Sequence, residues 1–283
     1  MDVTPRMENS EGARNRRRGR PSSGRAPANA GRVQSLDRAL NLLECLAKEE
    51  GGMSLTDLAQ RVALAPSTAH RLLKSLARRR FAHHDEERGL WFVGVQAFTV
   101  GNAFLRGRDF VGMARPIMRK LMEDSGESVN LAVLDDGAVV YLTQVECHEM
   151  MRALARPGGR APIHCSGVGK ALLSALPKTE VDSILARHGL ALHTRKTVTD
   201  PVELKRALED ARQQRFALDD EEQVLGMRCV AAVIYDEYAY PLAAISLSGP
   251  TARITDRRID GLGMLAVRAA DEVTDKIGGR RPA

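Results

Sequence analysis

Apolar residues recur at helical spacing in three stretches of the N-terminal third of the chain and predict short helices at residues 36–46, 54–62 and 66–76. Ser54 is placed to cap the second helix, with Asp57 in its first turn, and Pro66 suits the first turn of the third. The intervening residues 63–65 are too few for another element. We therefore expect a helix-turn-helix whose core the first helix completes.

The face of the third helix opposite its apolar stripe is polar and basic. Ser67, His70, Arg71 and Lys74 lie at i, i+3, i+4 and i+7, with Thr68 at the margin. Such a face can enter the major groove of DNA and donate to base edges and phosphates. A helical hairpin with a solvated outer face carries the same pattern, so this helix alone does not decide between the two interpretations.

Two short apolar runs follow at residues 81–84 and 90–93, around a polar turn that contains glycine. This pattern is typical of a β-hairpin. Three helices followed by a hairpin predict a winged helix-turn-helix. The tip of the wing is acidic, which disfavours phosphate contacts, so Arg88 is the one wing residue that we expect to bind DNA.

The rest of the chain alternates between strand and helix patterns. The sequence Asp135-Asp136-Gly137 separates two apolar runs, 129–134 and 138–145, and is a strong hairpin signal. Hairpins with helices inserted between them predict an α+β domain with a mainly antiparallel sheet. Further strands are expected at 150–155, 229–235 and 242–248, and helices at 95–108, 111–124, 168–176, 178–188, 201–213 and 256–277.

One face of the last strand is small and polar. Because successive residues of a strand point to opposite faces, Ala244, Ser246 and Ser248 share one face, while residues 243, 245 and 247 share the other. The small face would leave room beside the sheet. Cys229 begins the neighbouring strand, directly after an acidic cluster. Taken singly, small residues on a strand usually accommodate a helix, and a cysteine in an apolar run is usually part of the core.

The segment 164–170, His-Cys-Ser-Gly-Val-Gly-Lys, leads into a helix whose first N–H groups can hold a small carboxylate. It is not a phosphate-binding loop, because His164 replaces the first glycine and Ala171 replaces the magnesium-binding hydroxyl residue. A cysteine nucleophile needs a histidine base, and nothing in the sequence pairs His148 or His164 with a cysteine. We therefore expect no enzyme, no catalytic residue and no cofactor.

The positive charge of the chain lies in one segment. The net charge is +6, and residues 1–32 carry eight arginines against three carboxylates, whereas residues 95–283 balance to zero. Such an arm is too polar to bury a core and should be disordered on its own. It either follows DNA phosphates or the minor groove, or it is a solvated tail, and the sequence favours neither.

Length and cysteine usage set further limits. A chain of 283 residues suggests two domains. Its four cysteines, at positions 45, 147, 165 and 229, are widely scattered, so we expect neither a disulfide framework nor a metal site. No apolar run resembles a signal peptide or is long enough to cross a membrane. A cytoplasmic protein with no membrane partner is the simplest expectation.

Three blocks of the sequence together resemble the IclR family of bacterial transcription regulators: residues 33–40, the helix-turn-helix, and residues 219–250. The last block, from Asp219-Asp-Glu-Glu through Ser246-Leu-Ser248-Gly-Pro, is the most specific. The resemblance covers residue 33 to the end. It implies an N-terminal winged helix, a linker helix and a C-terminal GAF-like α/β effector-binding domain. It also implies dimers, often paired into tetramers, on palindromic promoter DNA.

Within that family the sequence is most similar to glyoxylate-responsive members, including regulators of the β-hydroxyaspartate cycle. This resemblance implies an effector site made of backbone groups of Gly167 and Val168 and of side chains of an acid, a thiol and two hydroxyls. A two-carbon oxoacid presents a carboxylate and a carbonyl or its hydrate, and an acid beside that anion must accept from the hydrate or be protonated. The implied side chains are Asp219, Cys229, Ser246 and Ser248.

The chain is thus expected to comprise an arm (1–32), a DNA-binding winged helix-turn-helix (33–94), a linker helix (95–110) and an effector-binding and oligomerisation domain (111–283). Its expected partners are double-stranded promoter DNA, a small oxoacid and further copies of itself, as a homodimer or a dimer of dimers. Pyruvate or an aromatic acid is the alternative effector. The rival classes are an architectural DNA-binding protein that acts through the arm and an enzyme that uses Cys229 or Cys165.

Overall fold

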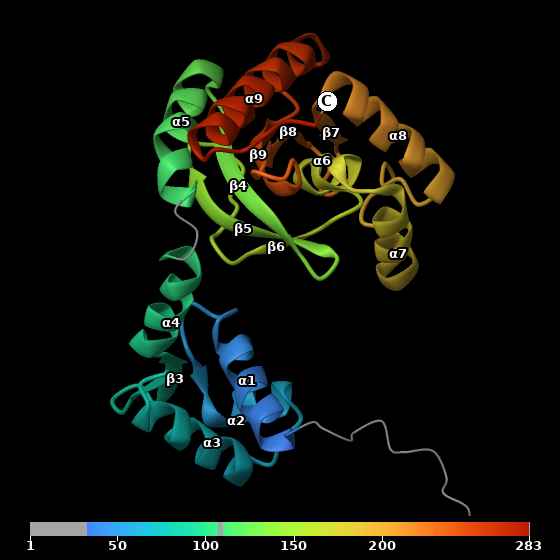
Figure 1. The fold of residues 1–283 in the computed structure, drawn as a ribbon. Coiled ribbons are helices and arrows are strands. Elements are labelled where there is room, and N and C mark those ends of the chain that lie inside the picture. The colour runs from blue at the N-terminus through green and yellow to red at the C-terminus, as the bar shows by residue number, and fades with distance from the viewer. Residues whose placement is uncertain (1–32, 107–109, 283) are drawn as a thin grey trace, which may run out of the picture. The chain divides into compact units, whose positions relative to one another are not determined.

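The computed structural model describes residues 33–106 and 110–282, which form two compact units divided between Thr99 and Val100 (Figure 1). The predicted arm, 1–32, and part of the predicted linker, 107–109, lie outside the described residues. The N-terminal unit contains α1 (Gln34–Leu46), β1 (Met53–Ser54), α2 (Leu55–Arg61), α3 (Pro66–Arg78), β2 (Ala82–Asp85), β3 (Leu90–Val93) and the start of α4 (Val95–Arg106).

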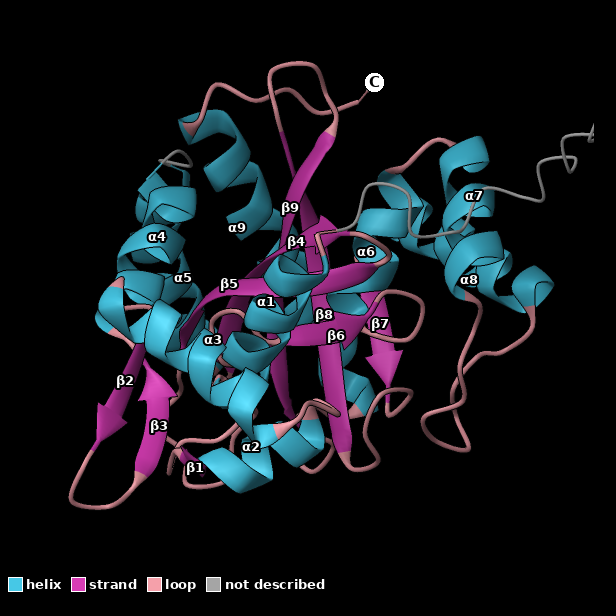
Figure 2. Cartoon of the chain, turned by 90° about the horizontal axis from the view of Figure 1, so that it is seen from below, coloured by secondary structure: helices cyan, strands magenta, loops and turns pink. Residues whose placement is uncertain are grey.

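Three helices and a small sheet form the N-terminal unit, which confirms the winged helix-turn-helix. The wing strands β2 and β3 pair as an antiparallel hairpin (Figure 2). The short β1, which the sequence did not suggest, adds a third strand by pairing Met53 with Trp91. The apolar faces of the three helices meet beneath this sheet in one core, in which Leu42, Leu58 and Leu73 are fully buried.

Local signals fix the helix-turn-helix. The Ser54 hydroxyl accepts from the N–H of Asp57 at 3.2 Å and so caps α2, as predicted. Pro66 occupies the first turn of α3, where its missing N–H has no cost. Between the helices, Ala63 has a φ of 52°, a left-handed conformation that a side chain disfavours. The turn therefore stores strain at a position where glycine would be relaxed.

The C-terminal unit is built on one six-stranded antiparallel sheet with the strand order β6-β5-β4-β9-β8-β7. This architecture confirms the predicted α/β domain with an antiparallel sheet. Its elements are α5 (Phe110–Ser125), β4 (Ser128–Asp135), β5 (Ala138–Val145), β6 (Arg160–Pro162), α6 (Gly167–Ala175), α7 (Lys178–His188), α8 (Pro201–Gln214), β7 (Ala217–Asp220), β8 (Met227–Tyr235), β9 (Pro241–Pro250) and α9 (Asp256–Lys276).

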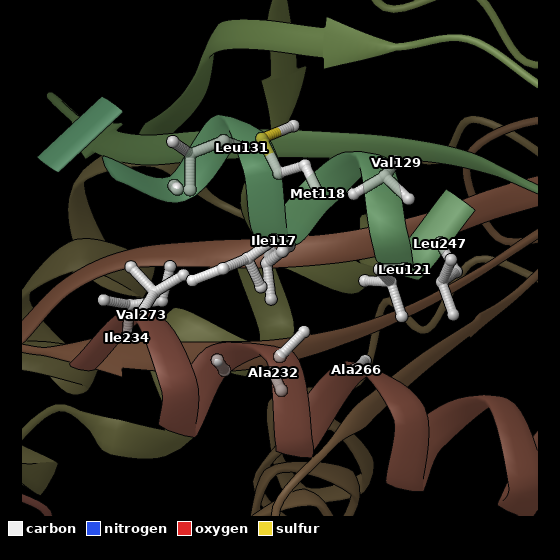
Figure 3. Close-up of a cluster of buried hydrophobic side chains, with 14 of the residues drawn as sticks. Ile117, Met118, Leu121, Val129, Leu131, Ala232, Ile234, Leu247, Ala266 and Val273 are labelled. Atoms are coloured by element: carbon white, nitrogen blue, oxygen red, sulfur yellow. The ribbon is translucent and has the colours of Figure 1, made fainter. Parts of the chain in front are cut away.

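Helices cover both faces of this sheet. On one face, α5 and α9 pack over β4, β8 and β9, and their apolar side chains interdigitate in the largest core of the protein (Figure 3). On the other face, α6 packs against the sheet and α8 packs against α6. The predicted alternation along β9 is confirmed, because Ile245 and Leu247 lie in the first core and Ala244 lies under α6. The start of α6 is thereby held against the small polar face of the sheet.

Two strand assignments differ from the sequence-based prediction. Residues 150–155 form a loop, not a strand, and Met150 is 97% exposed. Backbone groups of this loop form hydrogen bonds with the side chain of Gln144 and not with a neighbouring strand. The edge strand of the sheet beside β5 is therefore β6. The sequence also did not suggest β7, the strand in which the acidic cluster begins. Asp219 lies in this strand and is buried.

Among the described residues, no helix combines the length and the apolar character that crossing a membrane requires. The four cysteines are free thiols.

Candidate effector site and DNA-binding face

Strand register brings three side chains of the C-terminal unit into one row. Asp219 of β7 pairs with Cys229 of β8, and Cys229 pairs with Ser248 of β9. Directly opposed residues on adjacent antiparallel strands point to the same face of the sheet. Ser246 lies in the next row, opposite Asn130 of β4. An acid, a thiol and a hydroxyl, distant in sequence, therefore lie side by side.

A cavity of about 410 Å³ opens onto this row. The sheet forms its floor, the start of α6 one side, and the loop after β5 another. Its lining combines polar groups of modest size with a few apolar surfaces, which suits a small polar ligand. The lining includes Asn130, Tyr141, Ser166, Gly167, Asp219, Gln223, Cys229 and Ser248, together with residues 152–156 of the loop.

Gly167 allows the start of α6 to approach the row. A Cβ atom at this position would lie 2.8 Å from Sγ and 2.9 Å from the carbonyl oxygen of Cys229, closer than side chains tolerate. Ser166 caps the helix by accepting from the N–H of Gly169 at 3.1 Å. The N–H groups of Gly167 and Val168 have no intrahelical acceptor and lie at the positive end of the helix dipole. Such N–H groups at a helix start can hold an anion.

Asn130 organises the two strand serines. Its Nδ2 donates to Oγ of Ser246 at 3.3 Å and to Oγ of Ser248 at 3.2 Å. Its Oδ1 accepts from Nε2 of Gln144 at 2.8 Å, and Gln144 also bonds to the backbone of residues 153–155. Ser248 accepts from Asn130 and also lies within hydrogen-bond reach of Cys229. The same network ties the sheet to the loop over the cavity.

The acid of the row is poised between its charged and neutral forms. Burial raises the pKa of the Asp219 carboxyl to about 7, against the opposing effects of the Lys170 ammonium and of the N–H that Glu222 donates at 2.8 Å. Lys170 itself forms a buried ion pair with the Glu222 carboxylate. Burial also raises the pKa of Cys229 to about 11, so this thiol is protonated at neutral pH. The row can therefore donate hydrogen bonds from several groups.

The surroundings of the cavity are basic. Four arginines line it, whereas Asp219 is the single carboxylate in its lining. Most of these guanidinium groups are also paired with acids outside the lining, as Arg152 is with Glu146 at 2.6 Å and Arg160 is with Asp135 at 2.7 Å. These ion pairs offset much of the positive charge of the four arginines.

The structure places the six predicted effector residues at three depths. Gly167, Asp219, Cys229 and Ser248 line the cavity. Ser246 is fully buried behind it and contacts Asn130, so it acts on the cavity through that amide. Val168 is fully buried in the core between α6 and the sheet and does not line the cavity.

Sequence reasoning missed several residues of this site, chiefly Asn130, Tyr141 and Gln144. Asn130 carries a signal that was available, because a lone amide inside an apolar strand run must find hydrogen-bond partners once it is buried. The arginines of the loop after β5 had no such signal, because the sequence had suggested a strand there.

The predicted DNA-binding residues lie on α3 and the wing of the N-terminal unit. Ser67, Arg71 and Lys74 are exposed, and Thr68 and His70 are partly buried. The turns of α3 that carry residues 70–78 form one wall of a groove, and the wing forms the other. Arg88 is exposed at the wing, and its guanidinium lies 5.8 Å from the centre of the Phe92 ring.

Two further basic residues line this groove, Arg78 and His84. The His84 ring lies 4.5 Å from that of Trp91, and His70 meets the same indole edge-on at 6.5 Å. Trp91 is buried in the core and so fixes both imidazoles relative to α3. Arg78 and His84 were not predicted. Arg78 lies at the end of α3 and His84 in β2, and both segments had been interpreted only as parts of the fold.

Comparison with known proteins identifies both units. Residues 35–86 match the IclR helix-turn-helix domain, and residues 102–275 match the bacterial transcriptional regulator IclR C-terminal domain. The acetate operon repressor of Salmonella typhimurium is 48% identical over 94% of this chain and 97% of its own length. The HTH-type transcriptional regulator BhcR of Paracoccus denitrificans is 41% identical over 95% of this chain and 97% of its own.

A solved structure with the same fold is that of the Thermotoga maritima IclR, with a TM-score of 0.73 and 27% identity over 87% of this chain and all of that one. Relatives and family models alike describe transcription regulators, which agrees with the expectation that this protein is not an enzyme. The chain belongs to the IclR family and is a DNA-binding transcription regulator with a C-terminal effector-binding domain.

Proposed function

We propose that this regulator binds a small 2-oxoacid, with glyoxylate the favoured ligand, in the cavity above Asp219, Cys229 and Ser248. Effector binding would change its affinity for a palindromic promoter site and so control genes of two-carbon metabolism. The observation that carries the proposal is the meeting, in one cavity, of Gly167 at the start of α6 with an acid, a thiol and a hydroxyl in one row.

The chemistry of a two-carbon oxoacid suits these groups. Its carboxylate would accept from the N–H groups of Gly167 and Val168, where the helix dipole stabilises an anion. Its carbonyl, or the hydroxyls of its hydrate, would meet Ser248 and Asp219. A carboxyl whose pKa is about 7 can donate when protonated or accept from the hydrate when ionised. Both forms of the ligand therefore have partners.

Direct DNA contacts are proposed for α3 and the wing. In this proposal α3 enters the major groove, and its exposed basic residues contact base edges and phosphates. Arg88 would reach the backbone from the wing. The full set is Ser67, Thr68, His70, Arg71, Lys74 and Arg88, to which the groove adds Arg78 and His84 as candidates.

A palindromic site requires at least two copies of the chain. Three large apolar side chains of the N-terminal unit support self-association: Leu36 is 56% exposed, Leu40 46% and Phe98 70%. A second copy would remove this surface from water. We propose a homodimer or a dimer of dimers. Since its target is chromosomal DNA, the protein would act in the bacterial cytoplasm.

Calorimetric titration of the full chain with glyoxylate, pyruvate, glycolate and benzoate tests the ligand. We expect the strongest binding with glyoxylate, because it is small and offers both a carboxylate and a readily hydrated carbonyl. If pyruvate or benzoate binds more tightly than glyoxylate, the effector is one of the alternative acids and not glyoxylate. No heat with any of the four acids would contradict an oxoacid site.

A substitution at the helix start locates the binding site. Gly167→Ala places a methyl group against Cys229 and should abolish glyoxylate binding. Gly261→Ala, a glycine of α9 whose Cβ would meet open space, is the matched control and should bind normally. Equal affinity of both variants for glyoxylate would place the ligand elsewhere.

The architectural alternative makes a different prediction. If the arm drives sequence-independent binding, deletion of residues 1–32 should abolish DNA binding altogether. Under our proposal the truncated chain still prefers its operator, selected from a random-sequence library, over scrambled DNA. Equal affinity for the two DNAs in the full chain would favour the architectural class.

A further inference from the structure

His164, Cys165 and His193 form a cluster of potential metal ligands that the proposed effector site does not use. One ligand atom from each residue lies within 4.8 Å of the other two. His164 and Cys165 occupy the turn directly before α6 and are 4% and 0% exposed. His193 lies in the loop between α7 and α8 and is exposed. Two buried ligands and one exposed ligand provide a site with a path for an ion to enter.

The separation of the two imidazoles agrees with shared coordination. Their ring centroids are 5.8 Å apart. Two imidazoles on one tetrahedral zinc ion, with Zn–N distances of about 2.0 Å, have centroids about 5 Å apart and ligand atoms about 3.5 Å apart. Movement of about 1 Å would close the cluster around an ion. The exposed side chain of His193 can supply that movement because few contacts hold it.

The ring of His164 has a backbone carbonyl as a hydrogen-bond partner, as many metal-binding histidines do. Its Nε2 lies 3.0 Å from the carbonyl oxygen of Ala191. Because a carbonyl can only accept a hydrogen bond, Nε2 carries the ring hydrogen, and Nδ1 keeps its lone pair. Metal-ligating histidines usually donate their second nitrogen to such a carbonyl, which fixes the tautomer.

We propose that His164, Cys165 and His193 bind a zinc-class divalent ion. A metal–sulfur bond and two metal–nitrogen bonds form, the S–H bond of Cys165 breaks, and its proton passes to solvent. The remaining coordination position is taken by water at the exposed side. A thiolate with two imidazoles suits Zn²⁺ or Co²⁺ and disfavours Mg²⁺, which prefers oxygen ligands. The sequence alone did not suggest these three ligands, because His193 lies far from His164 and Cys165 in the chain.

An ion bound by the cluster would connect the loop that carries His193 to the start of α6. The loop that carries His193 also holds the acidic turn, because the hydroxyls of Thr194 and Thr197 donate to the carbonyls of Glu221 and Glu222, each at 2.7 Å. Cys165 directly precedes the cap of α6. A bound ion would therefore join the start of α6, which lines the cavity, to the loop that holds residues 221 and 222. This consequence for the effector rests on the proposed function, whereas metal binding itself does not.

Titration of the full, reduced and tag-free chain with Co²⁺ tests the proposal. We expect one equivalent to produce the visible bands of tetrahedral Co²⁺ and a near-ultraviolet thiolate charge-transfer band, both removed by Zn²⁺ and unaffected by Mg²⁺. Cys165→Ser should lose the thiolate band. His193→Ala, at an exposed position that folding does not need, should weaken Co²⁺ binding by about tenfold or more.

Two matched controls separate this cluster from adventitious binding. Cys147→Ser changes another buried thiol, and His188→Ala changes another histidine of the same unit. Both should bind Co²⁺ as the parent chain does. The proposal is overturned if the parent chain shows no thiolate band, if Cys165→Ser and His193→Ala keep the parent affinity, or if the controls lose it equally.

Discussion

The DNA-binding face and the effector cavity are assembled in opposite ways. Most of the proposed DNA contacts lie on α3, a single helix of 13 residues. The cavity takes its lining from six strands, the start of α6 and two loops. A helix sets the spacing of its side chains through its own geometry, whereas a sheet does so only through strand register. The DNA-binding face is therefore a local structure and the cavity a non-local one.

Because of this difference, the DNA-binding face and the cavity depend on the stability of different cores. The DNA-binding face requires that one small core holds α3 in place, and that core belongs to the N-terminal unit alone. The cavity requires that β7, β8 and β9 keep their register, which the two large cores on either face of the sheet enforce. Perturbing one region should leave the other intact.

The largest expected effect comes from Leu73→Ala, at a fully buried position of α3. Loss of the buried side chain should destabilise the N-terminal unit by about 3 kcal/mol. Denaturant unfolding followed by fluorescence measures this directly, because Trp91 is the one tryptophan of the chain and lies in that core. Glyoxylate binding should be unchanged. A parallel loss of glyoxylate affinity would show that the two units do not fold independently.

The next effect concerns the contacts of the DNA-binding face. Arg71→Ala should weaken specific operator binding by about 10- to 100-fold, the usual value of a good base or phosphate contact. Arg268→Ala, at an exposed position of α9, removes the same charge from the other unit and is the matched control. Fluorescence anisotropy with labelled operator measures both. Equal affinities would mean that α3 does not read DNA through Arg71.

The pH dependence of effector affinity examines the electrostatics of the cavity. A bound carboxylate disfavours a second negative charge nearby, so it binds best when Asp219 is protonated. With a pKa of about 7, glyoxylate affinity should be full below that pH and fall as the pH rises through it, by about tenfold between pH 6 and pH 8. Calorimetry should show a flat profile for Asp219→Asn. Affinity that increases with pH would mean that ionised Asp219 accepts from the hydrate.

The smallest effect isolates the turn between α2 and α3. Ala63 has a left-handed backbone, so Ala63→Gly should stabilise the N-terminal unit by up to about 1 kcal/mol. Trp91 fluorescence in denaturant measures the shift. Operator affinity should stay the same because the turn carries no proposed DNA contact. Destabilisation would instead indicate that the larger entropy of glycine in the unfolded chain outweighs the relief of strain.

The same contrast explains what the sequence could predict. The winged helix and its exposed face followed from helical spacing, the cap at Ser54 and the proline at position 66, which are all local signals. In the C-terminal unit, the hairpin at Asp136 and Gly137 was equally readable. The loop at 150–155 was not, because its backbone bonds to the side chains of Gln144 and Arg253 and not to a neighbouring strand.

Site residues followed the same rule. Asp219, Cys229 and Ser248 were named from a family resemblance, and strand register aligns them in one row. Asn130 was missed because it enters from β4, more than a hundred residues before the serines to which it bonds. The proposed boundaries of the four parts of the chain remain a prediction, although the division inside α4 is compatible with a linker there.

The central claim is that a ligand in the non-local site controls the local one. The most direct measurement is operator affinity with and without saturating glyoxylate for the parent chain, Ser248→Ala, and the control Ser183→Ala, an exposed serine of α7. We predict that glyoxylate changes operator affinity by about tenfold in the parent chain and the control, and has no effect on Ser248→Ala. An unresponsive parent chain, or an equal response in all three proteins, would contradict the account.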